Sequence, residues 1–369
     1  MGEALDPVFA LPFEPALEDG AFEALALRIF AFQFAHNRPY AAWCARRSRT
    51  PATVRHWQEI PAVPTAAFKE VALVAGPAAR AEAVFRTSGT TAGGARRGTH
   101  HVLDLSLYHR SLLAGFRAML LPDRARPVML SLVPPASQWP ESSLAHMIDT
   151  VMAAEGAPGS RACAGVRNGL DQPGLARALR AAEQDARPVC LLGTSFAYVH
   201  WLDALDAADE RFRLPAGSRL MDTGGFKGQS RAVDEDEMRA RYRDRLGIEP
   251  AFAINEYGMT EMCSQFYDTT LRETVLGGAA GPRRKRVPPW VRTRVVHPDT
   301  LEPVATGVPG LLQHFDLANA GSVMAIQTED LGVRAGDGFR VLGRAVGAAP
   351  RGCSIAMDEL LSAARGSPP

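Results

Sequence analysis

The sequence predicts a layered α/β protein with a small β-rich part towards its C-terminus. In the first two thirds of the chain, short apolar runs typical of buried strands alternate with segments whose apolar residues recur at helical spacing. From about residue 290 the pattern changes to short β-like runs separated by turn residues. The chain has 369 residues, more than one hydrophobic core usually contains, so we expect one large layered domain with an appendage, or two domains.

The N-terminal part is expected to be helical and then extended. Residues 20–47 carry apolar residues at helical spacing, interrupted at Asn37-Arg38-Pro39, which predicts a helix, a turn and a second short helix. The segment IPAVPTAAFKEVALV contains two prolines before an apolar run and predicts an extended connection into a strand. AEAVF, residues 81–85, predicts a strand leading into a loop.

Beyond that loop, predicted helices and strands alternate. A capping signal at Asp104 opens the helix DLSLYHRSLLAGFRAML, and RPVMLSLVPP predicts a buried strand. LARALRAAEQD is expected to be a helix, RPVCLLGTS a strand and FAYVHWLDALDAA a helix. This alternation is typical of a layered α/β sheet.

Composition narrows the function classes. The chain is 46% hydrophobic and 22% charged with a formal charge of +1, so no strong field favours nucleic acid or an anionic membrane. We find no targeting segment and no apolar run of membrane-spanning length, and we expect a cytoplasmic protein. The five cysteines are scattered and odd in number, which predicts reduced thiols. The basic cluster 283–286 lies between Gly-Pro and Pro-Pro and is expected to be an exposed loop.

Three motifs carry candidate chemistry, and the first is FRTSGTTAGGARRGTHH, residues 85–101. Glycine and hydroxyl residues between a strand and a helix wrap backbone N–H groups around an anion. The motif is not a Walker loop, because no lysine follows the glycines. Taken alone, it is equally compatible with a flexible linker.

The second motif is INEYGMTEM, residues 254–262, and the third is TEDLGVRAGDGFRVLGR, residues 328–344. Tyr257, Thr260 and Glu261 would offer an aromatic face, a hydroxyl and a carboxylate, which suit a base, a phosphate and Mg²⁺. Asp330 would accept two hydrogen bonds from ribose hydroxyls. Each motif also fits an ordinary element: a turn and helix start for the second, a hairpin with acidic turn residues for the third.

The ordered trio resembles the adenylate-forming superfamily of acyl-CoA synthetases, luciferases and peptide-synthetase adenylation domains. Further segments, such as RIFAFQFAHNRPYAAWC, TGGFKGQSR and LGRAVGAAPRGCSIAMDELL, resemble the acyl-protein synthetase of the bacterial luminescence fatty-acid reductase system. That resemblance extends from about residue 21 to 361. It implies that a fatty acid and ATP give acyl-AMP and pyrophosphate, after which the acyl group passes to an enzyme thiol and on to a reductase partner.

The resemblance also implies roles for individual residues. Tyr257 would stack on adenine beside the turn residue Gly258, Thr260 would touch the α-phosphate, Glu261 would bind Mg²⁺, and Asp330 would hold the ribose. Arg344 would lie at the hinge of the C-terminal part. The β- and γ-phosphates would be held by Thr87, Ser88, Gly89, Thr90 and Thr91. The adenine would lie beside Gly224 and Gly225. The implied organisation is an adenylation core over 1–290, a β-rich subdomain of that core over 291–343, and a hinge and short tail over 344–369.

The C-terminal end departs from the superfamily pattern. Typical members end in a mobile domain with a catalytic lysine, whereas here only 25 residues follow Arg344 and none is lysine. Lys227 in GGFKG is the best substitute, with Arg96 and Arg97 as a second possibility. Cys353 in the tail resembles the family's acyl carrier, because a thiolate near a helix N-terminus is a good nucleophile toward an acyl-adenylate. A buried structural role is the alternative for this cysteine.

The acyl pocket and the final acceptor are less defined. Trp139, His146 and Met147 would line the pocket, although a lone histidine on an apolar helix is more often part of the core. His100 and His101 are expected at a strand edge and not at a metal site. Two alternatives stay open: transfer of the acyl group to coenzyme A or an amine, as in phenylacetate-type ligases, and a non-catalytic nucleotide-binding subunit.

Overall fold

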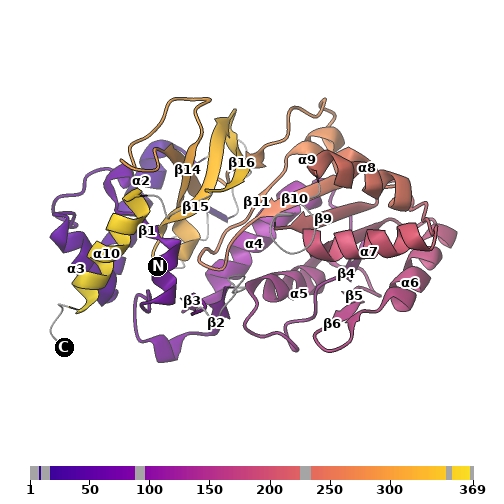
Figure 1. Cartoon of the computed structure of the whole chain (residues 1–369), viewed down its shortest axis with the longest axis horizontal. Helices are drawn as coiled ribbons and strands as arrows, with labels where there is room; N and C mark the ends of the chain where they lie inside the picture. The colour runs from indigo at the N-terminus through magenta and orange to yellow at the C-terminus, as the bar shows by residue number, and fades with distance from the viewer. Residues whose placement is uncertain (1–7, 10–16, 88–95, 225–233, 346–350, 366–369) are drawn as a thin grey trace. The chain divides into compact units, whose positions relative to one another are not determined.

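The computed structural model describes residues 8–9, 17–87, 96–224, 234–345 and 351–365, with only the backbone for 351–355 and 365. The chain forms two compact units (Figure 1). The first comprises 1–114, 259–265 and 286–369, and the second comprises 115–258 and 266–285. Each contains helices and strands, so the α/β class is confirmed. The functional division at residues 290 and 343 stays a prediction.

The sheet of the second unit is parallel except at one edge. Its strand order is β11-β10-β9-β8-β4-β5, and only β11 runs antiparallel to its neighbour. Because neighbouring parallel strands end at the same edge, the ends of β8, β9 and β10 bring Thr194, Thr223 and Tyr257 to one side of the sheet. The strands are β4 (Val128–Ser131), β5 (Arg161–Ala162), β8 (Val189–Thr194), β9 (Arg219–Thr223), β10 (Ala253–Tyr257) and β11 (Phe266–Tyr267). A short hairpin, β6 (Ala164–Gly165) and β7 (Gly169–Leu170), follows β5.

The helices of this unit are α5 (Ser143–Glu155), α6 (Gln172–Gln184), α7 (Ser195–Ala207), α8 (Glu235–Leu246) and α9 (Thr270–Val275). α6, α7 and α8 share one buried cluster with the strands, in which Leu179, Trp201 and Tyr242 pack with Leu191 and Leu220. Each such side chain stabilises the fold by about 1.5–3 kcal/mol when it leaves water. Side-chain caps begin four of these helices: Ser142, Asp171, Thr194 and Asp234. The predicted alternation of helices and strands in this region is therefore confirmed.

The first unit contains a mostly antiparallel sheet of order β12-β16-β15-β14-β13, with β1 parallel to β15. A separate hairpin of β2 and β3 flanks the predicted phosphate loop. The strands are β1 (Val63–Pro64), β2 (Ala83–Arg86), β3 (Thr99–Val102), β12 (Lys285–Arg286), β13 (Val291–Val296), β14 (Gly310–Asp316), β15 (Ala325–Ala335) and β16 (Gly338–Arg344). Short 3₁₀ helices connect them: η1 (Trp57–Glu59), η2 (Thr65–Lys69), η3 (Ala78–Arg80) and η5 (Leu317–Asn319). A fourth, η4 (Pro250–Phe252), lies in the second unit.

The predicted N-terminal helix pair is confirmed as α2 (Asp19–His36) and α3 (Arg38–Arg46). Asn37 ends the first helix and caps the second, because its side chain accepts a hydrogen bond from the backbone N–H of Tyr40 at 3.3 Å. The last helix, α10 (Arg351–Arg365), packs against α3, where Arg46 donates to Ser362 at 3.0 Å. The remaining helix, α4 (Leu105–Leu120), begins in the first unit and ends in the second, and Asp104 binds the N–H of Ser106 as expected of a cap.

Two local predictions are wrong. The expected strand after the two prolines is absent from 65–74, where the 3₁₀ helix η2 and a non-regular stretch lie instead. The apolar residues Phe68, Leu73 and Val74 are buried there without strand pairing. The basic cluster is not an exposed loop: Lys285 and Arg286 form β12 and are only 6% and 8% exposed. Their partners, Asp268 and Asp337, lie far enough away in sequence that local composition does not predict the pairing.

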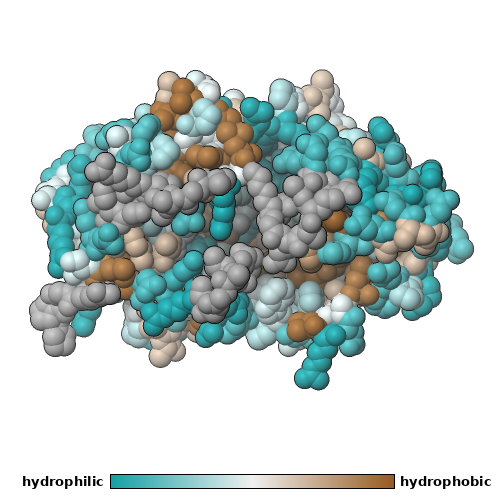
Figure 2. Space-filling view, viewed as in Figure 1, coloured by the Kyte–Doolittle hydropathy of each residue, from teal (hydrophilic) through white to brown (hydrophobic). Residues whose placement is uncertain are grey.

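The surface agrees with the composition. On the face shown in Figure 2, hydrophilic residues cover most of the coloured area and hydrophobic residues form scattered groups. Among the helices in the described ranges, none has the length and apolar character needed to cross a membrane.

Candidate active site

The two ends of the predicted phosphate loop are joined directly at the base of the β2–β3 hairpin. Thr87 donates its N–H to the carbonyl of Gly98 at 2.9 Å, and Gly98 returns its N–H to the Thr87 hydroxyl, also at 2.9 Å. Arg97 adds a bond from Nε to the Thr87 carbonyl at 2.6 Å. A Cβ at Gly98 would lie 3.0 Å from the Thr87 side chain, so this close approach favours glycine. The other predicted loop residues, Ser88, Gly89, Thr90 and Thr91, lie outside the described residues.

The Thr260–Glu261 segment belongs to the same unit and is held from the protein interior. His100 on β3 donates from Nδ1 to the Thr260 carbonyl at 2.7 Å. Asn319 donates from Nδ2 to the Glu261 carbonyl at 2.8 Å and to that of Val323 at 2.9 Å. Burial lowers the pKa of His100 to about 4, so the imidazole is neutral and keeps one N–H for this contact. His100 therefore has a structural place in the site, in a strand as expected.

A second anchor fixes the residues just after Glu261. Asp316 at the end of β14 accepts a hydrogen bond from the N–H of Cys263 at 3.0 Å and one from the Ser264 hydroxyl at 2.7 Å. Ser264 also lies 2.8 Å from the hydroxyl of Ser111, and the indole N–H of Trp290 donates to both hydroxyls at 3.0 Å. No helix begins at Thr260, so the alternative of a helix start for this motif is wrong.

Charged side chains meet around Glu261. Burial raises the pKa of its carboxyl to about 7, while the charges of Arg344 and Lys69 lower it and that of Asp330 raises it. Asp330 and Arg344 pair across the β15–β16 hairpin, with Nε 3.7 Å from Oδ1. Three residues predicted from two motifs thus lie in one unit. Lys69 was not predicted, although the scarcity of lysine in the chain marks it as unusual.

In the second unit, two more predicted residues lie at neighbouring strand ends. Tyr257 is the last residue of β10, and Gly224 follows the last residue of β9. The register pairs Glu256 with Thr223, which places Gly224 and Tyr257 at the same sheet edge. Gly224 has φ +85°, a backbone conformation that favours glycine. Gly258 follows directly in sequence, whereas Gly225 and Lys227 lie outside the described residues.

Beneath this edge lies a buried polar cluster that the sequence reasoning missed. Asp222 accepts bonds from the Tyr242 hydroxyl at 2.8 Å and from Asn255 Nδ2 at 2.7 Å, and burial raises the pKa of its carboxyl. Burial likewise raises the pKa of Glu256 to about 7, although the Thr223 hydroxyl donates to its carboxylate. These residues come from β9, α8 and β10. Because they lie far apart in the chain, no sequence motif indicates the cluster.

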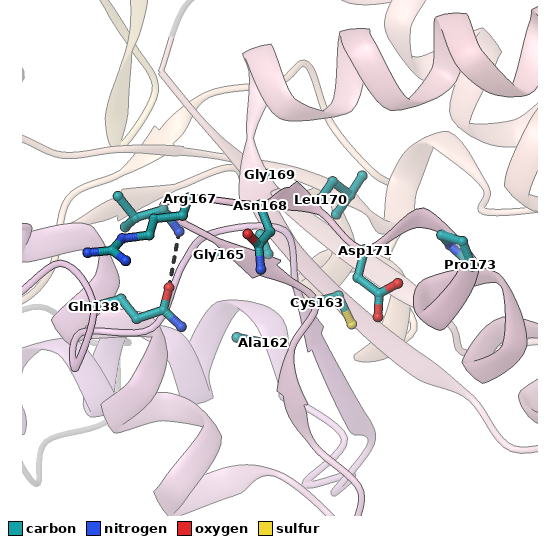
Figure 3. Close-up of a pocket in the computed structure, with 12 residues that line it drawn as sticks. Gln138, Ala162, Cys163, Gly165, Arg167, Asn168, Gly169, Leu170, Asp171 and Pro173 are labelled. Carbon is teal, nitrogen blue, oxygen red and sulfur yellow. Dashed lines mark hydrogen bonds between the residues drawn. The ribbon is translucent and has the colours of Figure 1, made fainter.

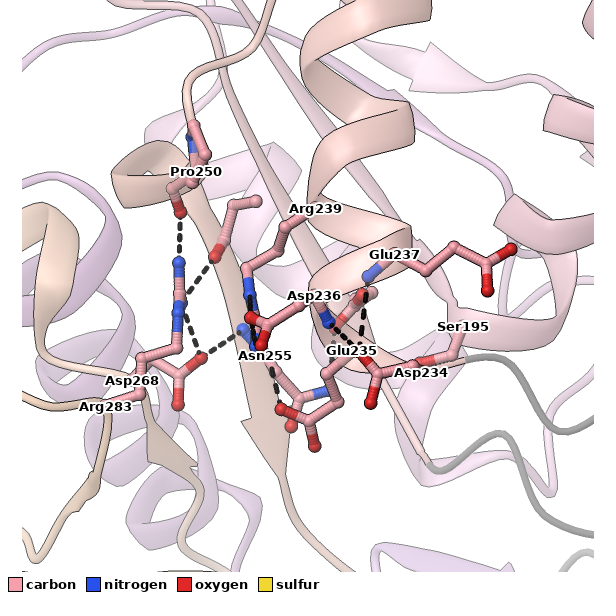
Figure 4. Close-up of polar contacts among 12 residues, drawn as sticks. Ser195, Asp234, Glu235, Asp236, Glu237, Arg239, Pro250, Asn255, Asp268 and Arg283 are labelled. Carbon is pink, nitrogen blue, oxygen red and sulfur yellow. Dashed lines mark hydrogen bonds and ion pairs between the residues drawn. The ribbon is translucent and has the colours of Figure 1, made fainter.

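The charges around this cluster are already paired. Lys285 donates from Nζ to the carbonyl of Asn255 at 2.7 Å and to Asp268 at 3.0 Å. Figure 4 shows Arg283 reaching Asp268 and the carbonyl of Pro250, near the N-terminal turn of α8. Lys285 is therefore committed to a structural role.

The predicted acyl-pocket residues lie on and before α5. His146 is half-buried and Met147 is buried in the helix, while Trp139 precedes it and is 39% exposed. The same unit contains a cavity of about 1080 Å³, lined by Gln138, Pro173 and residues 162–171 (Figure 3). Gln138 supports its rim, where its Oε1 accepts a bond from the N–H of Val166 at 3.1 Å. None of the three predicted residues lines this cavity.

The cysteines with described side chains are poor nucleophiles. Burial raises the pKa of Cys44 and Cys190 to about 12, and it raises those of Cys163 and Cys263 as well. Cys353 is the third residue of α10, within its first turn, and its side chain lies outside the description. In the described ranges no group of three or more His, Cys, Asp and Glu residues is arranged to hold a metal.

Comparisons with known proteins find a matching family and two similar proteins. The family model described as acyl-protein synthetase, LuxE, matches residues 170–362. Two proteins named long-chain-fatty-acid–luciferin-component ligase are similar: one from Aliivibrio fischeri is 24% identical and one from Vibrio harveyi 22% identical. These matches cover 47% and 49% of this chain, and 46% and 47% of the respective relatives, so the matched region spans about half of each relative's length.

Solved structures share the fold. A 2-hydroxyisobutyryl-CoA ligase in complex with 2-HIB-AMP aligns with a TM-score of 0.64 at 16% identity, over 88% of this chain and 67% of that chain. ATP-bound MatB from Rhodopseudomonas palustris aligns with a TM-score of 0.50 at 16% identity, over 73% and 49% of the two chains. At these identities the likeness establishes the fold alone. The family model, which matches just over half of the chain, shows that this protein belongs to the LuxE family of acyl-protein synthetases.

Proposed function

We propose that this protein activates a carboxylic acid, most simply a fatty acid, with ATP to form acyl-AMP and pyrophosphate, and then transfers the acyl group to Cys353. Membership of the LuxE family is the observation that carries the proposal. It is supported by the names of the relatives, which are ligases of long-chain fatty acids, and by the clustering of Glu261, Asp330 and Arg344 within one unit.

Residues from the three motifs would hold the nucleotide. Tyr257 would stack on adenine beside Gly224, Asp330 would bind the ribose, Thr260 would contact the α-phosphate, and the loop that starts at Thr87 would hold the other phosphates. An opposing cation suits the Glu261 carboxyl, whose pKa burial raises, since Mg²⁺ typically takes one or two carboxylates together with substrate phosphates. Bound there, Mg²⁺ would neutralise phosphate charge.

In the second half-reaction, the Cys353 thiolate would attack the acyl carbonyl, a thioester would form and AMP would leave with the bonding electrons. The position of Cys353 in the first turn of α10 supports this role, because a helix N-terminus lowers a thiol pKa. The raised pKa values of the four buried cysteines favour Cys353 by contrast. A cytoplasmic acyl-acceptor protein such as an acyl reductase would then take the acyl group.

The proposal is tested by ATP–pyrophosphate exchange with a panel of saturated fatty acids, followed by labelling with the radioactive acid that supports exchange best. Cys353→Ala is expected to keep exchange and lose the covalent label, whereas the buried-cysteine control Cys163→Ala keeps both. A labelled Cys353→Ala protein contradicts the carrier assignment. Product release that requires coenzyme A or an amine, with no acyl-enzyme, would favour the alternative acceptors. ATP binding without exchange for any acid would favour a non-catalytic subunit.

A further inference from the structure

The cation that assists adenylation has few candidates in this chain. The sequence contains three lysines, Lys69, Lys227 and Lys285. Lys285 is buried and bonded to Asn255 and Asp268, so it is not available. Lys227 lies outside the described residues. Lys69, at the end of η2, is exposed, and within the described ranges its side chain has no hydrogen bond or ion pair.

The two arginines after the phosphate loop are already engaged. Arg97 binds the carbonyl of Thr87 at 2.6 Å and closes the base of the loop. Arg96 pairs with Glu70 at 3.2 Å, and its side chain is 74% exposed. Because Glu70 directly follows Lys69, this ion pair links the chain beside Lys69 to Arg96 at the end of the loop.

The residue before Lys69 fixes η2 against the same loop. Phe68 is 2% exposed, and its ring packs edge-on against His100 with centroids 5.8 Å apart. A Cβ built on Gly98 would lie 3.5 Å from Phe68 and 3.0 Å from Thr87, so Phe68 fills the space behind the loop's base. Because His100 holds the Thr260 carbonyl, Phe68 packs between the base of the loop at Gly98 and the strand residue that anchors Thr260.

Charge supports the same placement. The ammonium of Lys69 and the guanidinium of Arg344 both interact electrostatically with the buried Glu261 carboxyl. Arg344 has Asp330 as a partner, whereas Lys69 has none among the residues that the structure describes. Because buried Phe68 fixes the backbone beside it, this cation needs little reorganisation to meet a phosphate.

We propose that Lys69 is a catalytic residue whose ammonium binds the pyrophosphate that leaves during acyl-adenylate formation. In this step a carboxylate oxygen of the acid bonds to the α-phosphorus, and the bond from that phosphorus to the α–β bridging oxygen breaks. The bonding electrons go to the bridging oxygen, so negative charge grows on pyrophosphate where Lys69 binds, and no proton is transferred. The inference rests on the proposed function and assigns to Lys69 a positive charge at the leaving group.

The test compares Lys69→Met with Lys69→Arg and with the control Arg28→Met. Arg28 is exposed on α2 and has no ion pair among the described residues, so the control removes one surface charge from the same unit. For Lys69→Met, kcat of ATP–pyrophosphate exchange is expected to fall by about 10²-fold with little change in the KM of the acid. Lys69→Arg keeps the charge and is expected to stay within about tenfold of the wild type. Circular dichroism and thermal unfolding verify the fold of each variant.

Binding supplies a second readout that does not require turnover. Calorimetry with magnesium pyrophosphate is expected to show about tenfold weaker binding to Lys69→Met, while AMP binds both proteins equally. If the wild type catalyses exchange and Lys69→Met does so at the same rate, the inference is overturned and the proposed function stays intact. Equal losses for pyrophosphate and AMP also overturn it, since they indicate a general disturbance. A wild-type chain that exchanges with no acid refutes the proposed function and the inference together.

Discussion

Replacement of the buried Glu256 by glutamine is expected to stabilise the protein at pH 8 and to have a smaller effect at pH 5. Glu256 is 4% exposed at the end of β10, and burial raises the pKa of its carboxyl to about 7 from an ordinary value of 4.5. Glutamine has nearly the same shape and keeps an oxygen that accepts the hydrogen bond from Thr223. The substitution therefore removes mainly the cost of ionisation inside the protein.

The magnitude follows from the two pKa values. Between pH 4.5 and 7 the carboxyl ionises in the unfolded chain but stays protonated in the folded protein, so the free energy of unfolding falls as the pH rises. Above pH 7 the folded carboxyl also ionises and the loss is complete, at about 3 kcal/mol by the usual conversion of pKa shift into energy. At pH 5 the loss is about 1 kcal/mol. The stabilisation by glutamine should thus grow by about 2 kcal/mol from pH 5 to pH 8.

Urea unfolding followed by tryptophan fluorescence at four pH values between 5 and 8 measures this difference. Trp201 packs in the same unit and reports on its unfolding. The exposed Glu249→Gln serves as the matched control and is expected to follow the wild type at every pH. A Glu256→Gln advantage that is absent, or constant across the range, would refute the reasoning, because it would mean that burial does not hold the carboxyl protonated.

Two further predictions concern buried contacts. Arg219 is 2% exposed and binds Asp123 at 2.7 Å and the carbonyl of Leu120 at 2.8 Å. Arg219→Ala is therefore expected to lower the free energy of unfolding by about 3 kcal/mol. A loss under about 1 kcal/mol in urea unfolding would contradict this. Asn319→Ala leaves the Glu261 and Val323 carbonyls without their donor and should reduce ATP–pyrophosphate exchange by tenfold or more. An Asn319→Ala protein with wild-type exchange would show that the Glu261 segment holds its position without this bond.

The proposed role of Lys69 adds a residue of η2 to the site. Phe68 of η2 and His100 connect the base of the loop at Gly98 to the Thr260 carbonyl, within one unit of the chain. In the proposed reaction the N-terminal part of the chain would supply a positive charge for adenylation. The lysine and the carboxylate come from residues 69 and 261, which explains why no single motif reveals their relation.

Several features could be predicted from residues that lie close together in the sequence. Helical spacing around Asn37, the cap at Asp104, and the alternation that becomes β4, α6, β8 and α7 depend on residues within a few positions of one another. The motif containing Glu261, the hairpin considered for residues 328–344, and the family resemblance were likewise visible, since each is carried by contiguous residues. For these features the sequence by itself determined the outcome.

Tertiary structure alone decided the electrostatics. The basic cluster 283–286 looked like a solvated loop, yet Lys285 is buried because Asp268 and Asn255 receive its ammonium. Segments far apart in the chain also raise the pKa of Glu256 by burying its carboxyl. They supply His100 and Asn319, which bind the carbonyls of Thr260 and Glu261. They likewise allow Lys69 to interact with the Glu261 carboxyl. The physical reason is that burial and charge pairing depend on distances through space, which sequence spacing does not report.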